Sequence, residues 1–256
     1  MRGPEIAQQA SGPKPNCIRH MPMRIPVLLL FVLTYLGSFA QHLTFEEWKE
    51  QSVVDMRLMP HYGNRPKNQK MLASDSTFVA LTLASIPDPH TAADHLVDLG
   101  FGLLREGNMT HAMYRFNQAY LLEPKNTNIY RGYGAFFMAM DRTDEAGRVY
   151  ADGLAIDSTE SRLMIDLSTA FLAAEYNARD REPEKADQLL AGSIKLLRRA
   201  LQYEPKSTEA NFKLSVAYLR KDECLEARKY RDICEELGGA ELTLEFEGAL
   251  QRKCPK

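Results

Sequence analysis

The sequence predicts an all-α protein in which short helical hairpins stack in succession. Residue types repeat at a spacing of 34: Ala112, Phe116 and Ala119 recur as Ala146, Tyr150 and Gly153, and Ser193 and Ala200 recur as Ala227 and Cys234. Prolines and glycines gather at the junctions between segments rich in Leu, Ala and Met, and no long run alternates apolar and polar residues. This period is typical of a solenoid whose units are each too small to bury an apolar face alone.

Bulk composition argues against nucleic acid as the main partner. The chain has 256 residues, of which 45% are hydrophobic and 26% charged, and its formal charge is −2. Residues 1–40 hold four basic residues and one acidic residue, so the remainder is more acidic still. Because phosphate binding needs a basic stripe, we expect a protein or peptide partner and no nucleic acid.

The first 40 residues contain the pattern of a secretory signal peptide. Met23 and Arg24 form a short basic start, Ile25 to Leu36 is an apolar run of 12 residues, and small residues precede position 41. We expect a signal peptide over 23–40, with cleavage before Gln41. A membrane anchor is the alternative, but the apolar stretch is shorter than the ~20 residues that cross a bilayer.

Residues 1–22 form a polar leader, and we hypothesise that translation begins at Met21 or Met23 instead. The mature chain is then exported, periplasmic or secreted, with no membrane span after signal cleavage.

Residues 41–90 form a helical lead-in. The capping-box pattern that begins at Thr44 predicts a helix that ends near Met59, and a second helix is expected over about 75–85. Pro89 is expected to close this segment.

The repeats occupy 91–241, with units near 93–126, 127–160, 161–207 and 208–241. The third unit holds about 13 extra residues, which we expect to form an elongated turn around 177–184. A capping helix and tail then cover 242–256, where Leu244, Phe246 and Leu250 can shield the open flank of the last repeat.

The repeat residues resemble those of the tetratricopeptide repeat (TPR) family. The first unit carries Leu99-Gly100, Ala112, Phe116, Ala119 and Pro124, and the second carries Tyr133-Gly134, Phe137, Ala146 and Tyr150. The third and fourth units depart from the family's pattern in their second helices. The layout, export signal included, looks like an exported bacterial TPR protein, and the resemblance covers roughly 150 residues.

The resemblance implies that the first helix of each hairpin lines a concave groove for a peptide. The groove residues we expect are largely apolar with interspersed arginines: Val97, Phe101, Leu104, Arg105, Arg131, Met138, Arg162, Ile165, Phe212 and Leu219. Alternatively, the lead-in residues Phe45, Trp48, Val53 and Phe78 fold back and fill this groove, which would then be a core.

The cysteines allow one disulfide. Cys224 and Cys254 each lie 15 residues from Gly239, so two antiparallel helices that fold at this glycine bring the ends together. If a bond forms, we expect Cys224–Cys254 with Cys234 free; the alternative is three reduced, packed cysteines.

No motif in the sequence indicates a reaction centre, a cofactor or a metal site. His90, His95 and His111 are interpreted as ordinary polar positions. We therefore predict a non-catalytic protein-interaction module of the cell envelope. The alternatives are a structural scaffold of an envelope complex and an enzyme of hydrolase type, which would need Glu and His to converge in one concave pocket.

Overall fold

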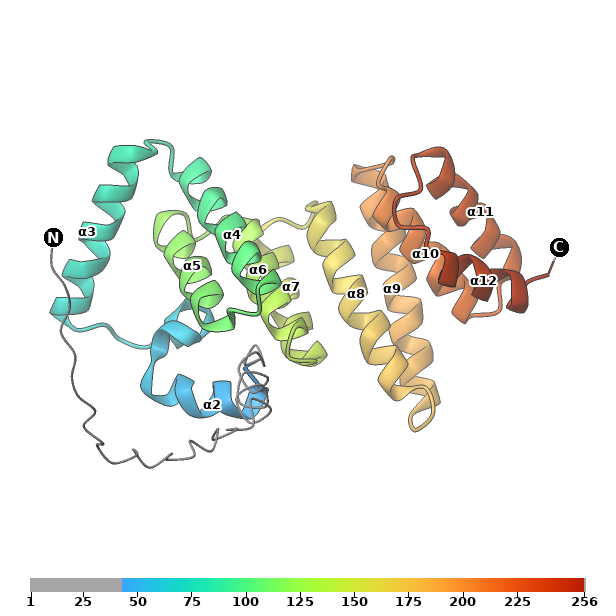
Figure 1. Ribbon diagram of the computed structural model, residues 1–256, viewed down its shortest axis with the longest axis horizontal. Coiled ribbons are helices and arrows are strands. Elements are labelled where there is room, and N and C mark those ends of the chain that lie inside the picture. Colours follow the sequence, from blue (N-terminus) through green and yellow to red (C-terminus); the bar gives the residue numbers. More distant parts are fainter. Residues whose placement is uncertain (1–42, 256) are drawn as a thin grey trace, which may run out of the picture. The chain divides into compact units, whose positions relative to one another are not determined.

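The computed structural model describes residues 43–255 (Figure 1). Every regular element in these residues is a helix, so the predicted all-α class is confirmed. No helix in this part of the chain is both long and apolar enough to cross a bilayer. The expected leader (1–22) and signal peptide (23–40) lie outside the described residues.

The lead-in begins as predicted, at a capping box. Helix α2 (Phe45–Val54) starts at Thr44, whose backbone N–H donates to Glu47 Oε2 over 2.9 Å while its hydroxyl accepts from the Glu47 backbone. The expectation that this helix continues to Met59 is wrong. It ends at Asp55, whose carboxylate instead accepts the N–H of Arg57 and starts the 3₁₀ helix η1 (Met56–Leu58).

A left-handed turn then fixes the lead-in to the repeats. In the 3₁₀ element η2 (Pro60–Asn64), His61, Tyr62, Gly63 and Asn64 all have φ between 53° and 63°. Non-glycine residues pay roughly 1–2 kcal/mol each for this conformation, so packing must hold it in place. The buried Asn117 does so, because its amide donates to the carbonyls of Arg57 and Met59 over 2.7 and 2.9 Å.

The next two helices begin earlier than predicted. Helix α3 (Gln69–Ser85) starts at Asn68, whose side chain caps the Met71 N–H. Helix α4 (Pro89–Arg105) starts at Pro89, after the N-cap Asp88. Pro89 therefore opens the first repeat rather than closing the lead-in, because a proline at the first helical position lacks only an N–H that the helix would not have used.

Four helical hairpins follow one another along the chain (Figure 1). They are α4 with α5 (Met109–Leu122), α6 (Thr127–Met138) with α7 (Thr143–Ile156), α8 (Ser161–Ala178) with α9 (Pro183–Tyr203), and α10 (Thr208–Arg220) with α11 (Cys224–Glu236). Each hairpin's first helix contacts both helices of the hairpin before it. The first helices α4, α6, α8 and α10 therefore lie side by side.

Glycines opposite aromatic rings explain why the hairpins pack closely. A methyl group on either Gly100 or Gly132 would overlap the ring of Phe116, and one on Gly134 would overlap the ring of Tyr150. Phe116 is fully buried and Tyr150 nearly so. The 34-residue echo thus marks the positions where one helix admits the aromatic side chain of another.

The turns inside the hairpins repeat as well. Gly107, Asp141 and Asp222 end the first helices of hairpins one, two and four with φ of 77°, 57° and 62°. The third hairpin differs, because α8 and α9 have 18 and 21 residues against 12 and 14 in α6 and α7. Its extra residues lengthen both helices by almost two turns each, so the expected elongated turn is wrong.

Helix α12 (Leu244–Lys253) lies against the fourth hairpin, with Phe246 and Leu250 buried. A disulfide joins Cys224 at the start of α11 to Cys254 after α12, with 5.4 Å between the Cα atoms. Cys234 is free and buried. The chain reverses at Gly238 and Gly239, whose positive φ values of 123° and 61° suit glycine.

Candidate groove pocket

Three successive first helices form a pocket of about 430 Å³, here called the groove pocket. Its lining comes from α4, α6 and α8: Asp94, Val97, Asp98, Phe101, Arg105, Asn128, Arg131 and Arg162. Five of the ten expected groove residues therefore meet in one place: Val97, Phe101, Arg105, Arg131 and Arg162.

The apolar floor of the pocket is rigid. Val97 is buried, with 3% exposure, and presents its remaining surface to the pocket. Phe101 is half-buried and packs edge-on against the Phe116 ring at 5.6 Å between centroids. The guanidinium of Arg131 lies 5.9 Å from the Phe101 ring, so apolar and cationic surfaces are adjacent.

The three arginines differ in whether a carboxylate of the protein pairs with them. Arg131 Nε donates to Asp166 Oδ2 over 2.7 Å, and both side chains are mostly buried. Burial raises the pKa of Asp166 above its usual value, although Arg131 opposes the shift. Arg105 and Arg162 are exposed in the pocket lining together with Asp98, so the exposed charges there are two positive and one negative.

The remaining expected groove residues lie elsewhere. Ile165 and Leu219 are buried, with 2% and 8% exposure, and pack in the core of the third and fourth hairpins. Leu104 and Met138 are half-buried against the core of the first two hairpins. None of these four residues lines the groove pocket, because hairpin packing buries part or all of each side chain.

Phe212 does not line the groove pocket either. Its ring packs against Phe246 of α12 at 5.1 Å between centroids. This contact places Phe246 of the capping helix α12 beside α10.

The described part of the lead-in does not fill the groove pocket, so the alternative left open by the sequence is not what the structure shows. Trp48 packs edge-on against Phe137 at 5.3 Å and donates from Nε1 to the Leu58 carbonyl over 2.8 Å. Phe45 lies under the Arg142 guanidinium, and Val53 is 68% exposed. None of the lead-in residues 43–88 lines the pocket.

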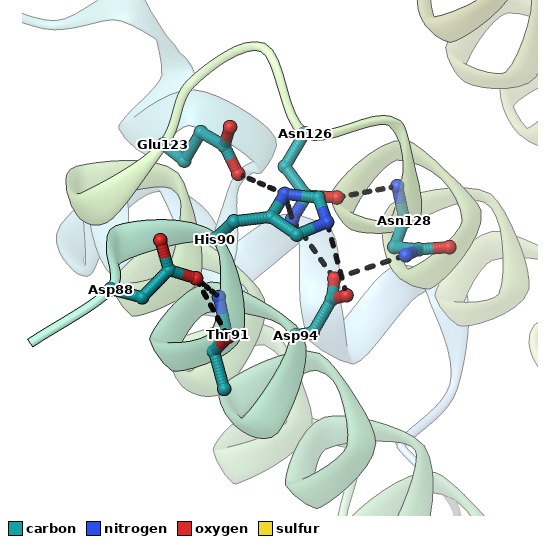
Figure 2. A network of polar contacts seen from close by, with 7 residues as sticks. All are labelled: Asp88, His90, Thr91, Asp94, Glu123, Asn126 and Asn128. Carbon is teal, nitrogen blue, oxygen red and sulfur yellow. Dashed lines mark hydrogen bonds and ion pairs between the residues drawn. The ribbon is translucent and has the colours of Figure 1, made fainter. Parts of the chain in front are cut away.

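A polar network fixes the edge of the pocket at the junction of the first two hairpins (Figure 2). The amides of Asn126 and Asn128 donate to Asp94 Oδ1 over 2.9 and 3.0 Å. His90 Nδ1 lies 2.7 Å from Glu123 Oε2, and its Nε2 lies 3.5 Å from Asp94 Oδ2. The hydrogen bond to Glu123 raises the pKa of His90. Asp94 and Asn128 are thereby held in place.

Sequence reasoning missed this network. Asn126 is almost fully buried and caps α6, just as Glu160 caps α8 at a spacing of 34. The recurrence of a polar N-cap residue at the repeat period is the sequence pattern that could have indicated this network. The histidines were interpreted individually, and no sequence pattern paired His90 with Glu123.

The lining of the groove pocket does not contain the residues that the hydrolase alternative requires. Among the described residues, neither Glu nor His lines the groove pocket, although the hydrolase alternative needed both. Both nitrogens of His90 face carboxylates, and the nearby Thr91 hydroxyl already donates to Asp88 over 2.6 Å. Within residues 43–255, no group of three or more His, Cys, Asp or Glu side chains has the arrangement of a metal site.

Comparison with known proteins supports the fold. The chain is similar to the crystal structure of a TPR protein from Thermus thermophilus, with 19% identity, a TM-score of 0.53, and coverage of 63% of this chain and 80% of that one. It is also similar to MamA, with 16% identity, a TM-score of 0.45, and coverage of 64% and 86%. No family model and no curated protein matches the sequence.

The chain therefore has the fold of a TPR solenoid, with a helical lead-in and a C-terminal capping helix. The resemblance seen in the sequence is confirmed at the level of the fold.

Proposed function

We propose that this chain is a non-catalytic interaction module of the cell envelope that binds a short extended peptide segment in the groove pocket. The observation that carries the proposal is the convergence of Val97, Phe101 and three arginines from three successive helices. A pocket of 430 Å³ lies in the size range of sites that receive side chains or small ligands.

The chemistry of the lining defines the segment. Val97 and Phe101 favour an apolar side chain, while the exposed Arg105 and Arg162 favour a carboxylate beside it. The Asn128 side chain already donates to Asp94, so its own carbonyl is left to accept a backbone N–H of the peptide. The preferred ligand is therefore an extended segment with an Asp or Glu next to a large apolar residue.

Location in the envelope rests on the signal-peptide pattern over 23–40. The Cys224–Cys254 disulfide supports it, because such bonds persist mainly in oxidising compartments. N-terminal sequencing of the mature protein tests this part. A mature chain that begins at Gln41 supports export, and an uncleaved chain in the cytoplasm contradicts it.

Photo-crosslinking tests the groove assignment. A benzophenone amino acid at position 98, on the pocket rim, should capture a partner in whole cells, whereas the same group at position 225, 85% exposed on α11, should not.

Variants of the pocket residues test whether the captured partner binds in the groove pocket. Phe101→Asp and Arg162→Glu should each abolish capture from position 98, while the surface control Leu225→Glu should not, with helicity checked by circular dichroism. Capture that survives both groove variants in folded protein would mean that the partner binds elsewhere.

A further inference from the structure

Helix α3 forms one wall of a second cavity, which is separate from the groove pocket. None of the 17 residues of α3 is buried, although the helix contacts both α4 and α5. Between α3 and α5 lies a cleft of about 480 Å³, here called the α3 cleft, and the η1–η2 segment lines one part of it (Figure 1 shows these elements). Its lining residues are Arg57, Tyr62, Lys67, Lys70, Met71, Ser74, Asp75, Phe78, Tyr114, Asn117, Gln118 and Leu121.

The α3 cleft is polarised along its length. Lys67 and Lys70 stand at the start of α3, next to the segment that carries Arg57. Phe78 lies eight residues further along the helix than Lys70, which is about 12 Å at 1.5 Å per residue. Leu121 lies at the C-terminal end of α5. One end of the cleft is therefore cationic, the Lys67–Asp75 pair lies part-way along it, and Phe78 and Leu121 line the far end.

The charges at the cationic end do not cancel. Arg57 pairs with Asp55 at 2.8 Å, and Lys67 pairs with Asp75 at 2.5 Å. The pairing of Arg57 uses Nε and Nη2, so Nη1 is left to donate. Lys70 is exposed and contributes one further positive charge. The N-terminal dipole of α3 adds to the positive potential at the same place.

We propose that the α3 cleft binds a monoanionic amphiphile, a carboxylate with an apolar chain such as a medium-chain fatty acid. The carboxylate accepts hydrogen bonds from Lys70 and Arg57 Nη1, which together neutralise one negative charge. The chain lies along Met71, Phe78 and Leu121, in a cleft whose volume is that of a small-ligand site. This site is independent of the peptide proposed for the groove pocket.

The open packing of α3 supports this assignment. Leu72 and Leu81 are 52% and 66% exposed, so few contacts hold the helix against the repeats. Lys67, with its ammonium nitrogen 3.2 Å from the centre of the Tyr62 ring, anchors the start of α3. The start of α3 is thus held by this contact, while much of the helix surface stays free of packing.

Displacement of a fluorescent probe tests the proposal on the full mature chain. Anilinonaphthalene sulfonate, an apolar anion, should bind and be displaced by dodecanoate, used below its micelle concentration. Dodecanol and dodecylammonium have the same chain without the negative charge, and they should displace the probe at least tenfold more weakly. Equal displacement by the three compounds, or no binding of the probe, would overturn the proposal.

Variants of α3 residues inside and outside the cleft lining locate the site. Lys70→Glu should weaken dodecanoate at least tenfold and leave dodecanol unchanged, an asymmetry that mere loss of structure would not produce. Phe78→Ala should weaken both compounds, whereas Leu72→Ala, which is 52% exposed and lies outside the cleft lining, should weaken neither. Dodecanoate affinity that is unchanged in Lys70→Glu contradicts the site. The site is also contradicted if an acidic apolar peptide displaces the probe at a lower concentration than dodecanoate does.

Discussion

Arg131 donates from Nε to Asp166 across 2.7 Å, and this contact joins the first helices of two neighbouring hairpins at the groove pocket. Arg162 lines the same pocket but is exposed. Two arginines in one lining thus differ, because one pairs across neighbouring hairpins and the other is exposed.

Substitution of these two arginines should separate stability from binding. Arg131→Met leaves Asp166 without its cation in a mostly buried place, and we expect a loss of about 1–3 kcal/mol in the free energy of unfolding. Protonation of Asp166, whose pKa is already raised, limits the loss. Urea denaturation measures the difference.

Arg162→Met is the matched control. It should change the free energy of unfolding by less than about 0.5 kcal/mol, because the side chain is exposed, while partner capture falls. An equal loss of stability in the two variants would show that the assigned roles are wrong.

Two glycines in α4 should respond in opposite ways to alanine. Gly100→Ala forces a methyl group into the Phe116 ring, and we expect destabilisation of about 1–3 kcal/mol, the range for overpacking. Gly102→Ala meets no atom closer than 3.9 Å and removes a flexible residue from a helix, so it should stabilise by roughly 0.5–1 kcal/mol. Thermal and urea unfolding of the two variants measure whether each substitution raises or lowers the free energy of unfolding. The same sign for both would contradict the packing described for Phe116.

Removal of the disulfide should weaken the C-terminal end of the solenoid. The bond closes a sequence separation of 30 residues, for which the chain-entropy relation gives roughly 3–4 kcal/mol. We expect the double variant Cys224→Ser with Cys254→Ser to lose that amount in urea unfolding. A reductant should destabilise the wild-type protein and leave the double variant unaffected.

Cys234→Ala provides the control for the remaining thiol. It should keep its sensitivity to reductant, because Cys234 takes no part in the bond. Loss of that sensitivity would indicate a different pairing.

The ion pair of His90 should make stability depend on pH. Its partner Glu123 raises the pKa of His90 in the folded state above the ordinary value of 6.5. The folded chain then holds this proton more tightly than the unfolded chain. The contribution is complete below pH 6.5 and disappears as the pH rises through the folded-state pKa.

We therefore expect His90→Gln to be less stable than the wild-type protein at about pH 6, with a difference that shrinks at about pH 9. His111→Gln, which changes an exposed histidine bound to Asn108, should show a smaller dependence. A His90→Gln deficit that does not change with pH would exclude the ion pair as its cause.

Much of the fold followed from the spacing of small and aromatic residues. Ala112, Phe116 and their counterparts 34 positions later predicted the hairpins, because the same close contact recurs in each unit. The capping box at Thr44 predicted the first described helix for a similarly local reason. Features that depend on residues close together in the sequence could therefore be predicted from it.

Apart from the Cys224–Cys254 pairing, features that depend on distant contacts could not be predicted from the sequence. Phe212 has the sequence position of a groove residue, and only the return of α12 removes it from the groove. The left-handed turn at His61 and Tyr62 is opposed by local preference and persists because Asn117 binds the preceding backbone. The length of α8 and α9 was misread because charged residues extend a helix as readily as they form a loop.

The groove pocket spans the first helices α4, α6 and α8. Neighbouring helix axes are about 8–10 Å apart, so the span is about 16–20 Å, which an extended chain crosses in about five or six residues. Such a short linear motif can sit in the unfolded tail of otherwise unrelated proteins. A single substitution in a tail would then be enough to recruit or release a client.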